Sequence, residues 1–444
     1  MRLEIGKLLK AGAFFVLLAA LSACASTSGP RPPVVAQQDR SEIERLPQPE
    51  FDNERERYDR RNFVRPPHLG GKEPVRVGLL LPFTANNEAA QKVASAMFDA
   101  AQLAVFDAAD ERFLLIPKDT KGDAHGAAAA ARSALADGAT IILGPLFSES
   151  VEAAAVVTRT AHVPMIAFSS NLDAGGNGVY LLSFPPEVEI ARVTEYAISQ
   201  DLTRFGILAP RTKYGDRVSG SFAEEVFVRG GVIVHEERYE QEPDAMLAPA
   251  KRLARYSKEI IPLEMRHDFD PNNPGPTGSD AGLTRGYQAV LMPEQGTLLR
   301  ALAPLLPYYN VDINRVKLLG VSSWNNPRLA REPALRGGWF AAPDPEIARN
   351  FENRFAGAFG APPPRLASLA YDATLLSARI AATSRRRGRF DEGAIADPNG
   401  YFGADGLFRL NQDGSVERGL AILEIQPGGI QVVDPAPRSF APGF

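Results

Sequence analysis

Val75-Arg-Val-Gly-Leu-Leu-Leu-Pro-Phe-Thr84 is the stretch of this 444-residue chain that decides its fold. Val75, Val77 and residues 79–81 are all apolar, so both faces of the strand predicted here are apolar. Such a strand is typical of a parallel sheet that is covered on both faces. The Ala-rich segment 87–109 has apolar residues at helical spacing and is expected to pack on the strand. The two segments are therefore predicted to form the first strand and helix of an α/β fold.

The same alternation of strand and helix continues for most of the chain. In the first half, strands are predicted at 113–117, 140–144 and 164–168, and helices at 125–137 and 148–161. In the second half, strands are predicted at 204–209, 232–236, 287–292 and 316–320, and helices at 214–229, 245–258, 295–309, 345–359 and 366–383. Strands that alternate with helices form right-handed βαβ units, so we predict doubly wound parallel sheets.

Two extended stretches, 180–186 and 338–343, interrupt the alternation and are predicted to cross between two lobes. Asp413-Gly414 between strand-like runs predicts a hairpin near the end of the fold. The predicted division is listed by range: 75–183 with 343–400 for lobe I, 184–342 with 401–430 for lobe II, and 431–444 as a frayed tail. A Pro- and Gly-rich stretch at 260–285 is predicted to be an inserted surface loop of lobe II.

The N-terminus has the features of a bacterial secretion signal. Basic residues precede an apolar run at 11–20, and Leu21-Ser-Ala-Cys24 follows it. The run is too short to span a membrane, so we predict a signal peptide over 1–23. Cys24 is the single cysteine and lies at the lipidated position of a bacterial lipobox, which predicts a lipid anchor; a plain signal peptide with an accidental cysteine is the alternative. Ala25, in place of Asp, implies sorting to the periplasmic face of the outer membrane.

Segment 24–74 is rich in proline, serine and charged residues and contains few large apolar ones. It is predicted to be a lipidated N-terminus followed by a disordered tether. The tether could let an anchored domain work away from its membrane, or it could be a simple spacer. The net charge of the chain is only -4, so no basic footprint indicates nucleic acid as a partner.

No sequence motif indicates catalysis. The chain has no Gly-x-Ser-x-Gly, P-loop or His-Glu-x-x-His motif, and its five histidines are far apart without metal-ligand spacing. We therefore predict a protein that is not an enzyme and has no catalytic residues, metal or cofactor. Trp324 and Trp339 are considered as exposed anchors for a partner, with a core position as the alternative for Trp339.

Several motifs between residues 75 and 430 resemble those of type I periplasmic binding proteins of the branched-chain amino-acid receptor class. They are Val77-Gly-Leu-Leu-Leu-Pro-Phe, Asp119-Thr, Ile141-Ile-Leu-Gly-Pro-Leu, Val163-Pro-Met-Ile-Ala-Phe-Ser-Ser-Asn, Tyr214-Gly and Leu369-Ala-Tyr-Asp-Ala. The resemblance implies two α/β lobes with a ligand cleft between them. Open parallel sheets bind ligands beyond the carboxyl ends of their strands, which agrees with this expectation.

Gly144-Pro145, the Leu-Leu-Leu-Pro start and the lipobox together resemble penicillin-binding-protein activator lipoproteins of the LpoA or LppC type. This resemblance implies an outer-membrane lipoprotein that binds and stimulates a bifunctional penicillin-binding protein and so regulates peptidoglycan synthesis by contact. Enterobacterial activators carry a helical-repeat domain ahead of the binding-protein-like domain, where this chain has its Pro-rich tether. The alternative function is a lipid-anchored receptor that delivers amino acids or amides to an ABC importer.

The receptor resemblance also implies a set of ligand-binding residues for a small amino-acid-like ligand. The positions that match are Ser148, Ser169, Ser170, Tyr214 and Ser323. Ser148 could instead be the N-cap of its helix, and Ser170 an ordinary loop residue. No acidic residue matches the ammonium ligand of the receptors.

Overall fold

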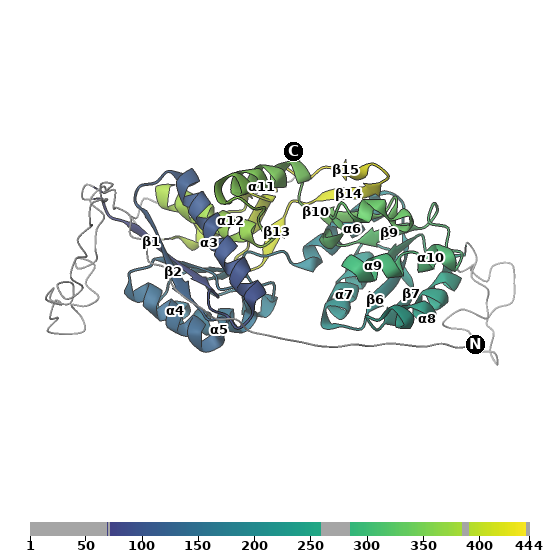
Figure 1. The fold of residues 1–444 in the computed structure, drawn as a ribbon, viewed down its shortest axis with the longest axis horizontal. Coiled ribbons are helices and arrows are strands. Elements are labelled where there is room, and N and C mark those ends of the chain that lie inside the picture. The colour runs from purple at the N-terminus through teal and green to yellow at the C-terminus, as the bar shows by residue number, and fades with distance from the viewer. Residues whose placement is uncertain (1–68, 70–71, 259–284, 384–389, 441–444) are drawn as a thin grey trace, which may run out of the picture. The chain divides into compact units, whose positions relative to one another are not determined.

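The computed structural model describes residues 69, 72–258, 285–383 and 390–440, all within one compact unit, residues 55–444. The predicted signal peptide, Cys24, nearly all of the tether and most of the insertion 260–285 lie outside the described residues. Two large sheets define lobe I and lobe II of this unit (Figure 1).

Lobe I contains a five-stranded parallel sheet with the order β2-β1-β3-β4-β5. Its strands are β1 (Val75–Leu81), β2 (Phe113–Asp119), β3 (Ile141–Leu143), β4 (Met165–Ala167) and β5 (Val179–Leu181). The first four confirm the prediction. The stretch predicted at 180–186 as an extended crossing begins inside β5, which pairs with β4.

Helices cover both faces of this sheet, as the apolar residues of β1 predict. They are α3 (Glu88–Ala108), α4 (Ala124–Ala136), α5 (Ser148–Thr160), α11 (Pro345–Phe359) and α12 (Ala367–Thr383). Val77 and Leu79 belong to a core cluster with α3 and α12, whereas Leu80 belongs to a cluster with α4 and α5. Neighbouring side chains of a strand point to opposite faces, so β1 contributes to both cores. Figure 1 shows α3 beside α12, with α4 and α5 beyond the sheet.

Lobe II contains a seven-stranded sheet with the order β15-β14-β10-β9-β8-β6-β7. Its strands are β6 (Arg204–Pro210), β7 (Val232–Tyr239), β8 (Ala289–Leu291), β9 (Lys317–Gly320), β10 (Trp339–Ala342), β14 (Ala421–Gln426) and β15 (Gly429–Asp434). Its helices are α6 (Pro186–Ser199), α7 (Lys213–Val228), α8 (Pro243–Ala254), α9 (Gly296–Leu302) and α10 (Leu305–Tyr308). The pairs β10–β14 and β14–β15 are antiparallel and the other pairs are parallel.

Three elements of lobe II differ from the sequence prediction. Segment 338–343, predicted as a crossing, contributes β10 to the sheet. The single helix predicted at 295–309 is two helices, because Pro304 has no N–H for a helical bond and ends the first one. Helix α6 was not predicted, although Pro186 is at its first position and Ile190, Val193 and Ala197 are buried at helical spacing.

A third, antiparallel sheet consists of β11 (Tyr401–Gly403), β12 (Gly406–Leu410) and β13 (Val416–Arg418), and a short helix, α13 (Glu392–Ile395), precedes it. The predicted hairpin is present as β12–β13, with residues 411–415 as its loop. Phe408, Leu410 and Val416 belong to the lobe I core cluster, so residues 401–418 pack with lobe I and not, as predicted, with lobe II. The residues predicted to begin a frayed tail at 431 continue β15 to Asp434.

Candidate functional site

A polar pocket lies at the carboxyl ends of the lobe II strands, where parallel sheets bind ligands. Its volume is about 500 Å³, within the range of small-molecule sites. The loops after β6, β7, β8 and β9 and the first turn of α6 supply its polar residues. These residues are Glu189, Thr212, Tyr214, Gln241, Glu294, Gln295, Ser322 and Ser323, and Arg365 from the segment before α12 (Ala367–Thr383) joins them.

Glu189 is a buried carboxylate of this pocket. Its Oε2 accepts a hydrogen bond of 2.8 Å from the backbone N–H of Ser322. Burial raises the pKa of Glu189, while the bond from Ser322 and the charge of Arg365 act in the opposite direction. Among the ion pairs of the described residues, none includes Glu189. The hydrogen-bond donor to its carboxyl group among the described residues is therefore a neutral backbone N–H.

Glu294 is a second buried carboxylate, and its bonded donors are neutral. Its Oε2 accepts from the hydroxyl of Tyr239 at 2.9 Å and from Nε2 of Gln241 at 3.1 Å. Its Oε1 accepts from the backbone N–H of Gln295 at 3.0 Å. The carboxyl group of Glu294 is therefore held in place by a phenol, an amide and a backbone N–H. The indole Nε1 of Trp324 donates to the backbone carbonyl of Glu294 at 3.1 Å and so fixes the turn that carries it.

Tyr214 and Ser323 line the same pocket, as the receptor resemblance implied. Tyr214 lies in the first turn of α7, and burial followed by the charges of Glu189 and Glu294 raises the pKa of its hydroxyl. The hydroxyl of Ser323 is buried and has no hydrogen-bond partner among the described residues. A buried hydroxyl without a partner calls for an explanation, and a ligand that bonds to it is one.

Arg365 lines the pocket with Phe184. Its guanidinium carbon lies 3.5 Å from the centre of the Phe184 ring, and its Nη1 donates to Oδ1 of Asp405 at 2.6 Å. Arg418 contacts the same ring at 4.2 Å and donates from Nε to the carbonyl of Ser183 at 2.6 Å. These contacts fix the segment that enters α6.

The three serines of lobe I do not line this pocket. Ser148 is the first residue of α5 and makes no side-chain cap bond, and the cap position belongs to Phe147. The Ser169 hydroxyl accepts from the backbone N–H of Asn171 at 3.1 Å, and the Ser170 carbonyl accepts from Arg217 at 2.9 Å. The structure thus brings Tyr214 and Ser323 together and leaves the three serines apart from them; the ligand roles of all five remain predictions.

A neighbouring pocket of about 480 Å³ lies at the carboxyl ends of the lobe I strands. Asn87 and Asp123, the N-caps of α3 and α4, line it together with Lys121 and Phe147. Leu366 lines both this pocket and the polar pocket of lobe II. The two pockets therefore adjoin at that residue.

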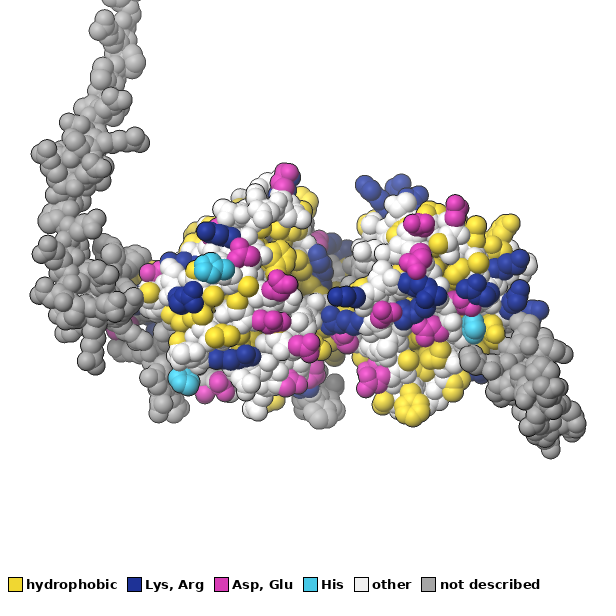
Figure 2. Space-filling view, turned by 90° about the horizontal axis from the view of Figure 1, so that it is seen from below, with side chains coloured by type: hydrophobic (Ala, Val, Ile, Leu, Met, Phe, Trp, Pro, Cys, Tyr) yellow, Lys and Arg dark blue, Asp and Glu magenta, His cyan; other side chains and the backbone are white. Residues whose placement is uncertain are grey.

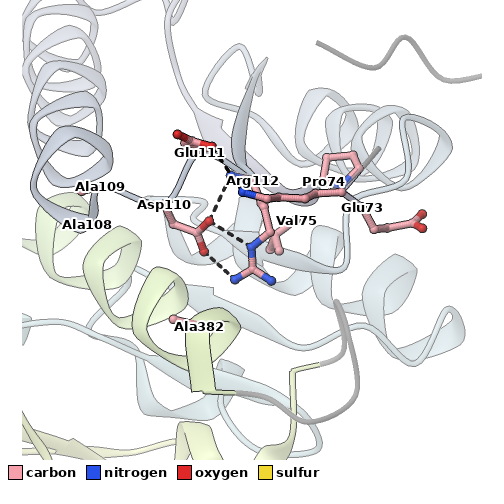
Figure 3. A pocket seen from close by; sticks show the side chains of 10 residues that line it. Glu73, Pro74, Val75, Ala108, Ala109, Asp110, Glu111, Arg112 and Ala382 are labelled. Carbon is pink, nitrogen blue, oxygen red and sulfur yellow. Dashed lines mark hydrogen bonds and ion pairs between the residues drawn. The ribbon is translucent and has the colours of Figure 1, made fainter. Parts of the chain in front are cut away.

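A larger cavity, of about 680 Å³, lies at the amino ends of β1 and β2 (Figure 3). Asp110 and Arg112 line it, and their side chains are bonded to each other at 3.0 and 2.7 Å. The arginine is therefore already paired, and the location is at the opposite end of the strands from the usual ligand position. We assign no ligand to this cavity.

Sequence reasoning missed Glu189, Glu294 and Arg365 as residues of the pocket. Glu294 follows a predicted strand directly, and this position at the carboxyl end of a parallel strand could have identified it. Glu189 was missed because α6 was not predicted. Arg365 precedes α12 and carries no local signal.

The prediction of Trp324 as an exposed anchor is wrong, because Trp324 is 0% exposed, whereas the core position considered for Trp339 is confirmed by its 8% exposure. Within the described ranges, no three His, Cys, Asp or Glu residues gather in a group that could hold a metal ion. No helix in the described part of the chain has the length and apolarity needed to cross a membrane. Acidic and basic side chains are interspersed on the face shown in Figure 2, in keeping with the small net charge.

Comparisons with known proteins agree with the architecture. Residues 74–254 match the family model described as periplasmic binding protein. A putative branched-chain amino acid ABC transporter protein from Rhodospirillum rubrum is similar with a TM-score of 0.66 and 18% identity over 81% of this chain and 100% of that one. A branched-chain amino acid ligand-binding protein from Burkholderia xenovorans has a TM-score of 0.60 and 16% identity over 82% and 96% of the two chains. At these identities the likeness concerns the fold.

One curated relative is similar in sequence over a shorter stretch. It is the penicillin-binding protein activator LpoA of Klebsiella pneumoniae, 30% identical over 103 residues. The match covers 23% of this chain and 14% of the relative.

Proposed function

Because this chain has the fold of type I periplasmic binding proteins, we propose that it acts by binding, and that it binds and stimulates a bifunctional penicillin-binding protein. The observation that carries this proposal is the 103-residue similarity to a penicillin-binding protein activator. The predicted lipid anchor at Cys24 would hold the protein at the periplasmic face of the outer membrane.

The test uses the full chain in detergent and a purified bifunctional peptidoglycan synthase from the same organism. We expect the synthase to be retained by the immobilised chain and its rate of glycan polymerisation or peptide cross-linking to rise severalfold. A lipid-anchored solute receptor of the same fold is the control. An unchanged rate at saturating concentrations, together with no retention, would refute the activator function.

A specific observation favours a second candidate, a solute receptor for amino acids or amides that serves an ABC importer. The polar pocket contains two buried carboxylates, Glu189 and Glu294, and the unpartnered hydroxyl of Ser323. Polar groups that converge in a pocket of this volume are typical of small-molecule sites.

This second function predicts stabilisation by its ligand. At a ligand concentration of one hundred times Kd the folded state should gain about 2.7 kcal/mol, visible as a higher Tm in a screen of amino acids and amides. Ser323→Ala should weaken binding about fivefold or more, because the pocket loses a hydroxyl donor. Ser199→Ala is the matched control, because Ser199 is exposed at the end of α6 and outside the pocket, and it should bind as the unchanged chain does. A screen in which no compound raises the Tm would exclude the receptor function.

A further inference from the structure

The polar pocket contains two buried carboxyl groups, and neither is in an ion pair among the described residues. Glu189 and Glu294 are 8% and 3% exposed, and both line the pocket together with Tyr214. Their hydrogen-bond donors are backbone N–H groups, a phenol and an amide, all of which are neutral. Burial of a carboxylate without a cation is costly. A ligand with positive charge would remove this cost at both residues.

Arg365 supplies a positive group at the same pocket. Its bond to Asp405 uses Nη1, and the described contacts of its side chain include no other hydrogen bond. Its side chain is 45% exposed, so its remaining N–H groups are accessible. Arginine binds carboxylates through two parallel hydrogen bonds, and the contact with Phe184 holds its plane in place.

We propose that the polar pocket takes a diamino acid, a small molecule with two ammonium groups and a carboxylate. The ammonium groups pair with Glu189 and Glu294, the carboxylate pairs with Arg365, and the Ser323 hydroxyl bonds to one of these polar groups. An amino acid with an aliphatic side chain leaves one of the two buried carboxylates without a cation. This inference rests on the second candidate function, the solute receptor.

The test compares two ligands that differ by a single amino group, L-lysine and L-norleucine. Isothermal titration of the full chain in detergent should give a Kd for lysine at least tenfold lower than for norleucine, as expected for an added charge-assisted bond. Glu189→Gln should remove most of this preference, because it removes one of the two carboxylates with which the ammonium groups of lysine pair. Glu187→Gln is the control, because Glu187 lies outside the pocket and pairs with Arg217.

The outcomes distinguish failure of the diamino-acid specificity from failure of the receptor function. Norleucine binding as tightly as lysine would overturn the diamino specificity and leave the receptor function in place. Binding of no amino acid or amide would overturn both. A preference for lysine that persists in folded Glu189→Gln and in Glu294→Gln would also overturn the assignment. Circular dichroism establishes folding, and Glu294→Gln alone serves if Glu189→Gln does not fold.

Discussion

Replacement of Trp324 by alanine is expected to lower the free energy of unfolding by about 3–5 kcal/mol. The Trp324 side chain is fully buried in the lobe II core and lies 6.4 Å from the Phe340 ring, centre to centre. The substitution deletes a buried indole and leaves a cavity, which the neighbouring strands can close only in part.

The backbone around Trp324 is shaped to the indole. A Cβ on Gly320 would lie 2.1 Å from an atom of the ring, and a Cβ on Gly338 would lie 2.9 Å from it. These glycines are on or next to β9 and β10, so the sheet approaches the ring closely. Such close packing limits collapse after truncation, and the cost should lie at the upper end of the range.

Urea unfolding followed by circular dichroism measures the effect. Trp324→Phe is the matched control, since it keeps an aromatic ring and loses the N–H that bonds to Glu294. It should cost less than the alanine variant, about 1–3 kcal/mol for the unsatisfied carbonyl and the smaller ring. A loss below about 1 kcal/mol for Trp324→Ala would contradict the packing described for lobe II.

The free energy of unfolding is expected to fall with rising pH because of Asp372. This residue of α12 is 1% exposed, and its Oδ1 accepts from the backbone N–H of Ala404 at 2.6 Å. Its Oδ2 is buried and has no hydrogen-bond partner among the described residues. Burial, followed by the charge of Asp405, raises the pKa of Asp372 to about 7 from the usual 3.8.

The sign of the effect follows from which state ionises first. As the pH rises above about 4, Asp372 loses its proton in the unfolded chain while the folded protein still retains it. The protein therefore loses stability from about pH 4 until the folded-state pKa of about 7 is passed, and it loses no more at higher pH. A shift of this size corresponds to a few kcal/mol, at about 1.4 kcal/mol per pH unit.

The measurement is the difference in unfolding free energy between the unchanged protein and Asp372→Asn at several pH values from 4 to 8. Because the other titrating groups are common to both proteins, the difference isolates Asp372. We expect the asparagine variant to gain relative stability steadily up to about pH 7. A difference that does not change with pH would show that Asp372 titrates normally in the folded protein.

Local sequence was sufficient to predict the helices and strands in which apolar pattern and capping residues indicate the same element. The strand at Val75–Leu81 is buried along its whole length and has Arg76 as its one charged residue, and the helix after it has an Asn87 cap, so their type and packing could be predicted. Pro186, by contrast, ended a stretch that looked extended, and the helix it begins was overlooked. The acidic residues of the first turn of α6 and its apolar residues at helical spacing indicate a helix, but the two prolines before them favoured an extended interpretation.

The pocket could be predicted only in part. Tyr214 follows a predicted strand, so its place near the ligand edge was accessible from sequence. The hydrogen bond between Glu189 and Ser322 joins residues 133 positions apart in the chain, and no local pattern contains it. The burial of Trp324 could not be predicted from local sequence either. Burial depends on which strands pack around a ring, and such strands can be distant from it in the sequence.

The pairing of β10 with β14 affects how lobe II folds during synthesis of the chain. Strand β10 bonds on one side to β9 and on the other to residues 421–424, with β15 beyond them. A nascent chain that has not yet delivered residues 421–434 presents β10 as an unpaired edge, a form that invites aggregation. Lobe II therefore cannot complete its sheet until nearly all of lobe I has been synthesised, and truncation before residue 421 should yield insoluble protein.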